Sequence, residues 1–116
     1  MKMRVPAFAG AALLLLPALA QAQTWPSRPV RIIVPFAAGG PADIYGRVLG
    51  QHLQETLGQP FVIEDRPGGC SLIGTDAVAK SAPDGYTLLM TSGSIVTANQ
   101  HIYKNMGFDQ IGRAFV

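Results

Sequence analysis

The sequence has a single cysteine, Cys70, among its 116 residues. One cysteine cannot form an internal disulfide, so the fold must be stabilised by its apolar core. Cys70 is therefore either a small buried residue or an exposed thiol, and the first is commoner. No cluster of cysteine, histidine and carboxylate residues has the spacing of metal ligands. The sequence therefore predicts neither a disulfide nor a metal site.

Charged residues are also few, at 14% of the chain. The formal net charge of +2 at pH 7 comes from Lys2 and Arg4, because the other seven of the nine basic residues balance the seven acidic ones. No basic stripe remains that could neutralise a run of phosphates. Nucleic acid is therefore not an expected partner.

The sequence offers no set of residues for catalysis. His52 and His101 are far apart along the chain, and Cys70 has no evident base as its partner. The G-x-G-x-x-G and G-x-x-x-x-G-K-[ST] strings of nucleotide-binding loops are both missing. We expect a protein without catalytic residues or cofactors, and a Rossmann-like nucleotide-binding enzyme is the alternative.

The first 22 residues have the features of a signal peptide. Lys2 and Arg4 precede an apolar stretch at residues 5–19, which is shorter than the roughly 20 residues that a membrane span needs. Ala20 and Ala22 are small residues of the kind that a signal peptidase recognises. We expect cleavage after Ala22, export to the periplasm, and a mature chain of residues 23–116 that does not span the membrane.

The mature sequence then follows the order of strand, glycine turn and helix. An apolar run at residues 30–34 is followed by a turn with Gly39 and Gly40 and by a helical pattern at residues 41–57. Proline in the first helical turn and Gly58 after the last one are typical of helix ends.

The same order repeats further along the chain. A strand is expected at residues 61–63, a turn at residues 66–69 and a helix at about residues 73–81. A third apolar run at residues 87–91 leads into a glycine-containing loop at residues 92–94. Strands that alternate with helices predict an α/β fold with a mostly parallel sheet and flanking helices.

The helix at residues 41–57 is expected to pack one apolar face on the sheet, and a third, short helix is expected at residues 98–104. The expected packing face consists of Ile44, Val48, Leu49, Leu53 and Leu57.

The carboxyl ends of parallel strands meet at one edge of a sheet, which is where open α/β folds bind ligands. Helix N-termini at that edge present unpaired N–H groups and favour anions. Asp43 lies in the first turn of the first helix. The two glycine turns therefore predict an anion-binding site, although glycine is common wherever a strand meets a helix.

The string IIVPFAAGGPADIYGRVLGQHLQETLGQPFVIEDRPGG, continued by IGTDAVAKSAPDGYTLLM, resembles the substrate-binding proteins of tripartite tricarboxylate transporters, the Bug family. The PF-x-x-GG, LGQP, RPG and APDGYTLL elements occur in the order and spacing of that family, over roughly residues 25–109. The resemblance implies a periplasmic-binding-protein-like fold of two α/β lobes. It also implies capture of a small organic carboxylate for a membrane permease, without catalysis.

The resemblance further implies that the loops at residues 36–43 and 68–72 contact the carboxylate, largely through backbone N–H groups and ordered water. Serine hydroxyls after the third strand would extend the site, although ordinary turn chemistry explains them equally well. The expected ligand-binding residues are Phe36, Ala37, Gly39, Gly40, Pro41, Ala42, Asp43, Gly68, Gly69, Cys70, Ser71, Leu72, Ser92 and Ser94.

Several positions depart from the family pattern. Pro41 and Ala42 stand where a small residue and then Thr or Ser are usual, which removes one N–H donor and one hydroxyl. Asp65 replaces an asparagine and adds negative charge, unless it pairs with Arg66 or caps local backbone. Cys70 stands where glycine is usual, so its side chain is expected to crowd the ligand or to change the backbone conformation.

Whole members of the family are more than twice as long as this chain. The resemblance therefore assigns residues 23–116 to part of the first lobe, so a sheet edge and helix faces are expected to be uncovered. A truncated gene product without function is the other alternative that the length leaves open.

Overall fold

The computed structural model describes residues 24–107. The signal peptide expected at residues 1–22 and the tail from residue 108 lie outside the described residues. Within residues 24–107, no helix combines the length and the apolar composition needed to cross a membrane.

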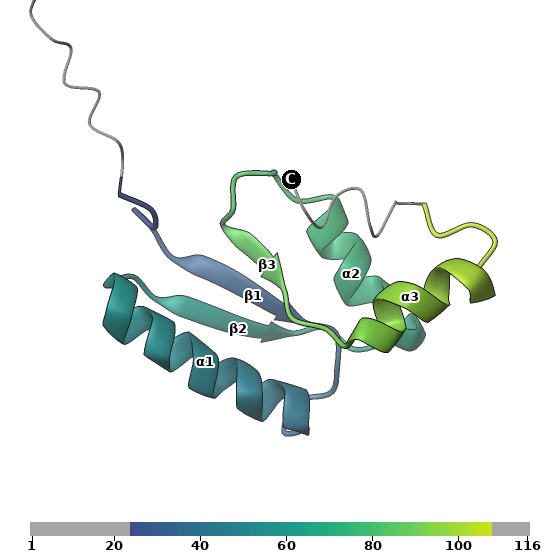
Figure 1. Ribbon diagram of the computed structural model, residues 1–116, viewed down its shortest axis with the longest axis horizontal. Helices are drawn as coiled ribbons and strands as arrows, with labels where there is room; N and C mark the ends of the chain where they lie inside the picture. The colour runs from purple at the N-terminus through teal and green to yellow at the C-terminus, as the bar shows by residue number, and fades with distance from the viewer. Residues whose placement is uncertain (1–23, 108–116) are drawn as a thin grey trace, which may run out of the picture.

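The sheet has three parallel strands in the order β2-β1-β3, so β1 lies in the centre (Figure 1). The strands are β1 at Val30–Val34, β2 at Phe61–Asp65 and β3 at Thr87–Leu89. Val30 pairs with Phe61 on one side, and Arg31 pairs with Thr87 on the other. Helix α1, Pro41–Leu57, connects β1 to β2, and helix α2, Leu72–Ala79, lies between β2 and β3. The predicted α/β class and parallel sheet are confirmed.

The ends of α1 agree with the sequence prediction. Pro41 begins the helix, and Gly58 ends it in the left-handed conformation with φ of 76°. The N–H of Gly58 donates to the carbonyl of Gln54 at 2.9 Å, which satisfies one of the last free carbonyls of the helix.

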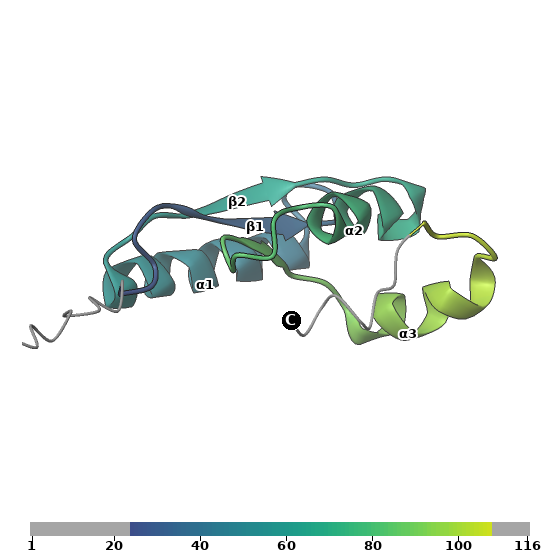
Figure 2. The same ribbon diagram turned by 90° about the horizontal axis from the view of Figure 1, so that it is seen from above.

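The third helix begins earlier than predicted. Helix α3 spans Gly93–Ile102, whereas the sequence analysis placed a loop at residues 92–94 and a helix at residues 98–104. Ser92 is the N-cap residue, and its carbonyl accepts the N–H of Ile95 at 3.1 Å. The start of α3 has no side-chain cap hydrogen bond, and the β-branched residues of this segment favour strands on propensity alone. Figure 2 shows that α3 stands away from the three strands.

The core lies between the sheet and α1. Val30, Ile32 and Val34 alternate along the central strand and are almost completely buried, and Phe61 of β2 joins them. Because β1 has a neighbouring strand on both sides, its backbone is shielded from water, and of its five side chains only that of Arg31 is exposed.

Helix α1 packs on this core with a different face from the one expected. The buried positions of α1 are Asp43, Gly46 and Gly50, and Leu53 packs against the core at its C-terminal half. A Cβ atom at Gly46 would lie 3.4 Å from the side chain of Val34, which shows how closely the helix backbone approaches β1.

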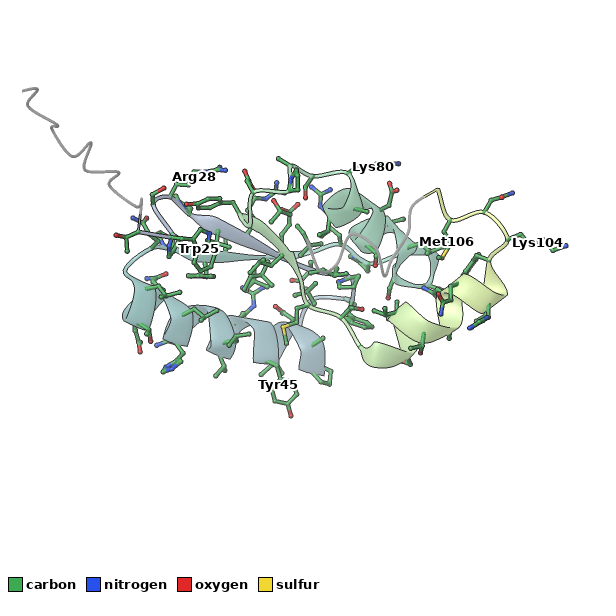
Figure 3. All side chains as sticks on the ribbon, turned by 45° about the horizontal axis from the view of Figure 1, so that its top comes forward. Trp25, Arg28, Tyr45, Lys80, Lys104 and Met106 are labelled. Carbon is green, nitrogen blue, oxygen red and sulfur yellow. The ribbon has the colours of Figure 1, made fainter. Side chains whose placement is uncertain are left out.

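Most of the expected packing residues point outward instead. Ile44 and Val48 are 56% and 65% exposed, and Leu49 and Leu57 are also exposed. Tyr45, which is 68% exposed, points away from the strands in Figure 3. The hydrophobic period correctly identified an apolar stripe on α1. The close contact with the sheet is made by a different stripe, that of the glycines, which has no hydrophobic signal in the sequence.

The two structural glycines Gly46 and Gly74 should respond oppositely to alanine. A Cβ atom at Gly74 would lie 2.8 Å from Cβ of Pro35 and 2.9 Å from the carbonyl oxygen of Arg66, so Gly74→Ala forces the backbone apart. We expect Gly74→Ala to lower the free energy of unfolding by about 1–3 kcal/mol.

Gly46→Ala is the matched control, because its Cβ meets neighbours only at ordinary contact distance and alanine favours helix by up to about 1 kcal/mol. Chemical denaturation of both variants tests this expectation. Equal losses of stability in the two variants would contradict the packing described here.

Candidate functional site at the carboxyl edge of the sheet

Three loops meet at the carboxyl edge of the sheet, because all three strands run in the same direction (Figure 1). The first connects β1 to α1, the second connects β2 to α2, and the third leads from β3 to α3. The second loop includes a short 3₁₀ turn, η1, at Gly69–Ser71. This convergence, predicted from the sequence, is confirmed.

The first loop is held by an internal carboxylate. The backbone N–H of Gly39 donates to Oδ2 of Asp43 at 2.8 Å, and the N–H of Gly40 donates to the carbonyl of Ala37 at 3.3 Å. Gly39 has a φ of 79°, a conformation that glycine adopts without strain. Both glycine N–H groups therefore have partners within the protein. Ala42 and Asp43 follow Pro41 in the first turn of α1, where helix N–H groups have no intrahelical acceptor.

Asp43 is only 4% exposed, and its charge is compensated by an arginine one helical turn later. Nε of Arg47 lies 2.6 Å from Oδ1 of Asp43. The N–H of Gly39 and the Arg47 guanidinium together hold the pKa of Asp43 below its ordinary value, against the opposing effect of burial. The carboxylate is therefore ionised at neutral pH.

Arg47 also reaches the end of the neighbouring strand. Its Nη2 lies 3.3 Å from Oδ2 of Asp65, the last residue of β2. Asp65 thus pairs with Arg47 and not with Arg66, which was one of the expected partners. Arg66 instead contacts Glu64 at 2.5 Å, and Arg31 pairs with the same carboxylate. Arg31 and then Arg66 hold the pKa of Glu64 below its ordinary value.

The second loop is fastened to the first by buried contacts. Oγ of Ser71 donates to the carbonyl of Pro35 at 3.0 Å, directly after β1, and Thr75 Oγ1 donates to the carbonyl of Ser71 at 2.8 Å. Gly74 lies against Pro35 so closely that no side chain fits between them. The hydroxyl of Ser71, one of the expected ligand contacts, therefore links the two loops.

Cys70 is exposed, so the less common of the two alternatives, an exposed thiol, is correct. Its backbone is left-handed, with φ of 51°, and Ser71 follows with φ of 70°. Few non-glycine residues adopt this conformation, which glycine adopts without strain.

Helix α3, which follows the third loop, contacts the second loop. Nδ2 of the buried Asn99 donates to the carbonyl of Cys70 at 3.2 Å, and the thiol of Cys70 raises the pKa of the Tyr103 hydroxyl through a hydrogen bond. Ser92 and Ser94 are hydrogen-bonded to each other at 3.0 Å and are exposed.

The expected ligand-binding residues thus lie on all three loops, and the first two loops adjoin. Phe36 and Ala42 turn partly into the core, Asp43 and Ser71 are buried, and Leu72 begins α2. The residues at or near the surface of the site are Ala37, Gly39, Gly40, Pro41, Gly68, Gly69, Cys70, Ser92 and Ser94.

The sequence analysis did not include Arg47, Gly74 or Asn99 in the site. Arg47 had a detectable signal, because an aspartate and an arginine four residues apart in a helix form an ion pair. Asn99 had none, since its partner is a backbone carbonyl 29 residues away. Within the described residues, histidine, cysteine and carboxylate side chains do not gather in groups of three or more that could hold a metal ion.

An open parallel sheet with glycine loops gathered at the carboxyl ends of its strands defines an α/β ligand-binding domain. Residues 45–113 match the family described as the tripartite tricarboxylate transporter family receptor. The chain belongs to this family, as its sequence motifs indicated.

Relatives and solved structures agree with this assignment. BugT of Bordetella pertussis is 56% identical over 73 residues, which are 63% of this chain and 22% of BugT. The structure of Rpa4515 of R. palustris with adipate is 40% identical with a TM-score of 0.69, over 74% of this chain and 29% of that one. MatC of Rhodopseudomonas palustris with bound malate is 44% identical with a TM-score of 0.53, over 55% of this chain and 22% of MatC. The chain spans less than a third of the length of each.

Asp43 should make the stability of the fold depend on acid. Because its pKa is lower in the folded state than in the unfolded chain, its contribution is complete above the unfolded value of about 3.9 and is lost as the pH falls through the folded pKa. We expect Asp43→Asn to be less stable than the wild type at pH 7 and to lose less stability between about pH 4 and pH 2.

Urea unfolding at a series of pH values measures both curves. Glu55→Gln, which removes an exposed carboxylate from the same helix, is the control. Its free energy of unfolding should vary with pH in the same way as that of the wild type. If the Asp43→Asn curve also stays parallel to the wild type down to pH 2, the Asp43 contacts do not stabilise the fold.

Proposed function

We propose that this chain forms one side of a binding site for a small organic carboxylate in an exported solute-binding protein. The observation that carries the proposal is the joining of two glycine loops at the carboxyl edge of the sheet by the Ser71 to Pro35 hydrogen bond. Solved relatives that hold adipate and malate support the choice of a carboxylate.

Recognition would use backbone donors. The N–H groups at the start of α1 and in the Gly68 to Cys70 turn carry no formal charge, yet they bind anions well, because the helix dipole adds to their hydrogen bonds. The nearby arginines Arg47 and Arg66 are already paired with carboxylates of the protein. The ligand charge would therefore be balanced by backbone dipoles and ordered water.

The proposal includes the cellular role that the family suggests. The mature chain would act in the periplasm after cleavage behind Ala22, and it would deliver its ligand to a membrane permease of the tripartite tricarboxylate type. Its chemistry would be capture and release, and no residue is assigned to catalysis.

Calorimetric titration of the purified chain with adipate and with malate tests the proposal. Saturable heat with either acid is the expected result, and retention of a nucleotide instead would favour the Rossmann-like alternative. If neither acid gives saturable heat with a chain that circular dichroism shows to be folded, this chain does not bind these ligands by itself.

Gly40→Val tests the location of the site. A Cβ atom at Gly40 would already lie 3.2 Å from the carbonyl oxygen of Ala37, so the valine side chain blocks close approach of a ligand to the turn. We expect the affinity to fall by at least about tenfold, or ~1.4 kcal/mol. His52→Ala, on the exposed side of α1, is the control and should bind as the wild type does. Unchanged affinity in Gly40→Val would place the site elsewhere.

A further inference from the structure

Asn99 is a buried polar residue on a helix that stands away from the sheet. It is 5% exposed and is the one buried residue of α3, whose ten residues all lie in the described part of the chain. Figure 2 shows α3 apart from the three strands, so this burial does not come from packing on the sheet. Buried amides nearly always have a hydrogen-bond partner, and Nδ2 of Asn99 donates to the carbonyl of Cys70 at 3.2 Å. Asn99 therefore joins α3 to the second loop of the candidate site.

The carbonyl that Asn99 holds belongs to a left-handed turn. Gly69, Cys70 and Ser71 follow one another with φ of 54°, 51° and 70°. Glycine adopts this conformation freely, whereas Cys70 and Ser71 are strained in it because Cβ approaches the following carbonyl oxygen. Such strain persists only where the surrounding structure holds the residue in place. The turn therefore depends on contacts from other segments.

The two strained residues are held from different sides. The hydroxyl of Ser71 donates to the carbonyl of Pro35 at 3.0 Å, so the end of β1 holds this residue. Cys70 is held by α3, because Asn99 donates to its carbonyl and its thiol is hydrogen-bonded to the hydroxyl of Tyr103, the C-cap residue of the helix. Helix α3 thus supports the residue of the turn that the first loop does not reach with a hydrogen bond.

Holding the Cys70 carbonyl also orients a donor. In a trans peptide bond the C=O and the following N–H point in opposite directions, so the Asn99 hydrogen bond fixes the direction of the Ser71 N–H. Backbone N–H groups of the second loop are the donors that the proposed function requires. The orientation of these donors therefore depends on a residue 29 positions further along the sequence.

We propose that Asn99 is a positioning residue of the candidate site, and that its amide keeps the second loop in the left-handed conformation that binds the carboxylate. This inference rests on the proposed function. Asn99 acts through Cys70 and not by contact with the ligand. Because glycine needs no support in this conformation, the effect of Asn99 on binding depends on the side chain at position 70.

A cycle of four chains tests the proposal: the wild type, Asn99→Ala, Cys70→Gly and the double variant. Each is titrated calorimetrically with malate and with adipate. We expect Asn99→Ala to weaken binding about tenfold in the wild type, because the strained turn then relaxes. In the Cys70→Gly background the same change should weaken binding by less than about threefold. A residue that only stabilises the fold would lower the melting temperature in both backgrounds. A loss of affinity that is not smaller in the Cys70→Gly background overturns the proposal.

A second readout does not require a carboxylate. Cys70 is the single cysteine of the chain and is exposed, so an aromatic disulfide reagent labels the turn itself. We expect Asn99→Ala to raise the rate of labelling at least about threefold, because the released turn opens more often. Gln100→Ala, at the neighbouring exposed position of α3, is the matched control and should label and bind as the wild type does. An unchanged labelling rate in Asn99→Ala also overturns the proposal.

The two readouts separate this inference from the proposed function. If the wild type binds neither acid while Asn99→Ala labels faster, the proposed function fails and the positioning of the turn by Asn99 is supported. If the wild type binds and Asn99→Ala binds equally well, the proposed function stands and this inference fails. Asn99→Leu, which has a similar volume and no donor, takes the place of Asn99→Ala where circular dichroism shows the alanine variant to be unfolded, and the same outcomes apply.

Discussion

The contact of the second strand-turn-helix unit with the end of β1 is the constraint on which the rest of the structure depends. Ser71 donates to the Pro35 carbonyl, and Gly74 lies against the same proline without room for a side chain. These contacts fix the second loop beside the first, and the Asn99 hydrogen bond to Cys70 then attaches α3 to the second loop. The candidate site is thus assembled by a few close contacts between backbone segments. The large apolar side chains contribute to it only through the strands that they hold in place.

Electrostatic compensation within the candidate site leaves the nearby Arg47 and Arg66 paired with carboxylates of the protein, so the proposed anion would bind without them. Asp43 and Asp65 place two carboxylates next to the first loop, and Arg47 lies between them. The N–H of Gly39 is directed at Asp43, so an internal carboxylate already uses one donor of the turn. An external carboxylate would have to bind at the donors that remain, at the start of α1 and in the second loop. The charge of Asp65, which departs from the family pattern, is likewise paired with Arg47.

Helix α1 combines two different surfaces. Gly46 and Gly50 allow its backbone to approach the sheet closely. The larger apolar side chains lie on the other side of the helix and are exposed. A helix with apolar or small residues on both sides is suited to a position between two layers. The described part of the chain supplies only one of these layers.

The sequence by itself determined the α/β class, the bounds of α1, the gathering of three loops at one edge and the family, because these depend on local periodicity, helix-end residues and motif order. It could not determine which face of α1 packs, since glycines carry no hydrophobic signal, and it placed the start of α3 incorrectly. It also could not find the partners of Arg47, Ser71 and Asn99 across the loops. Only the tertiary structure decided these points, because they are contacts between segments far apart in the sequence, and their geometry exists only after the strands have paired.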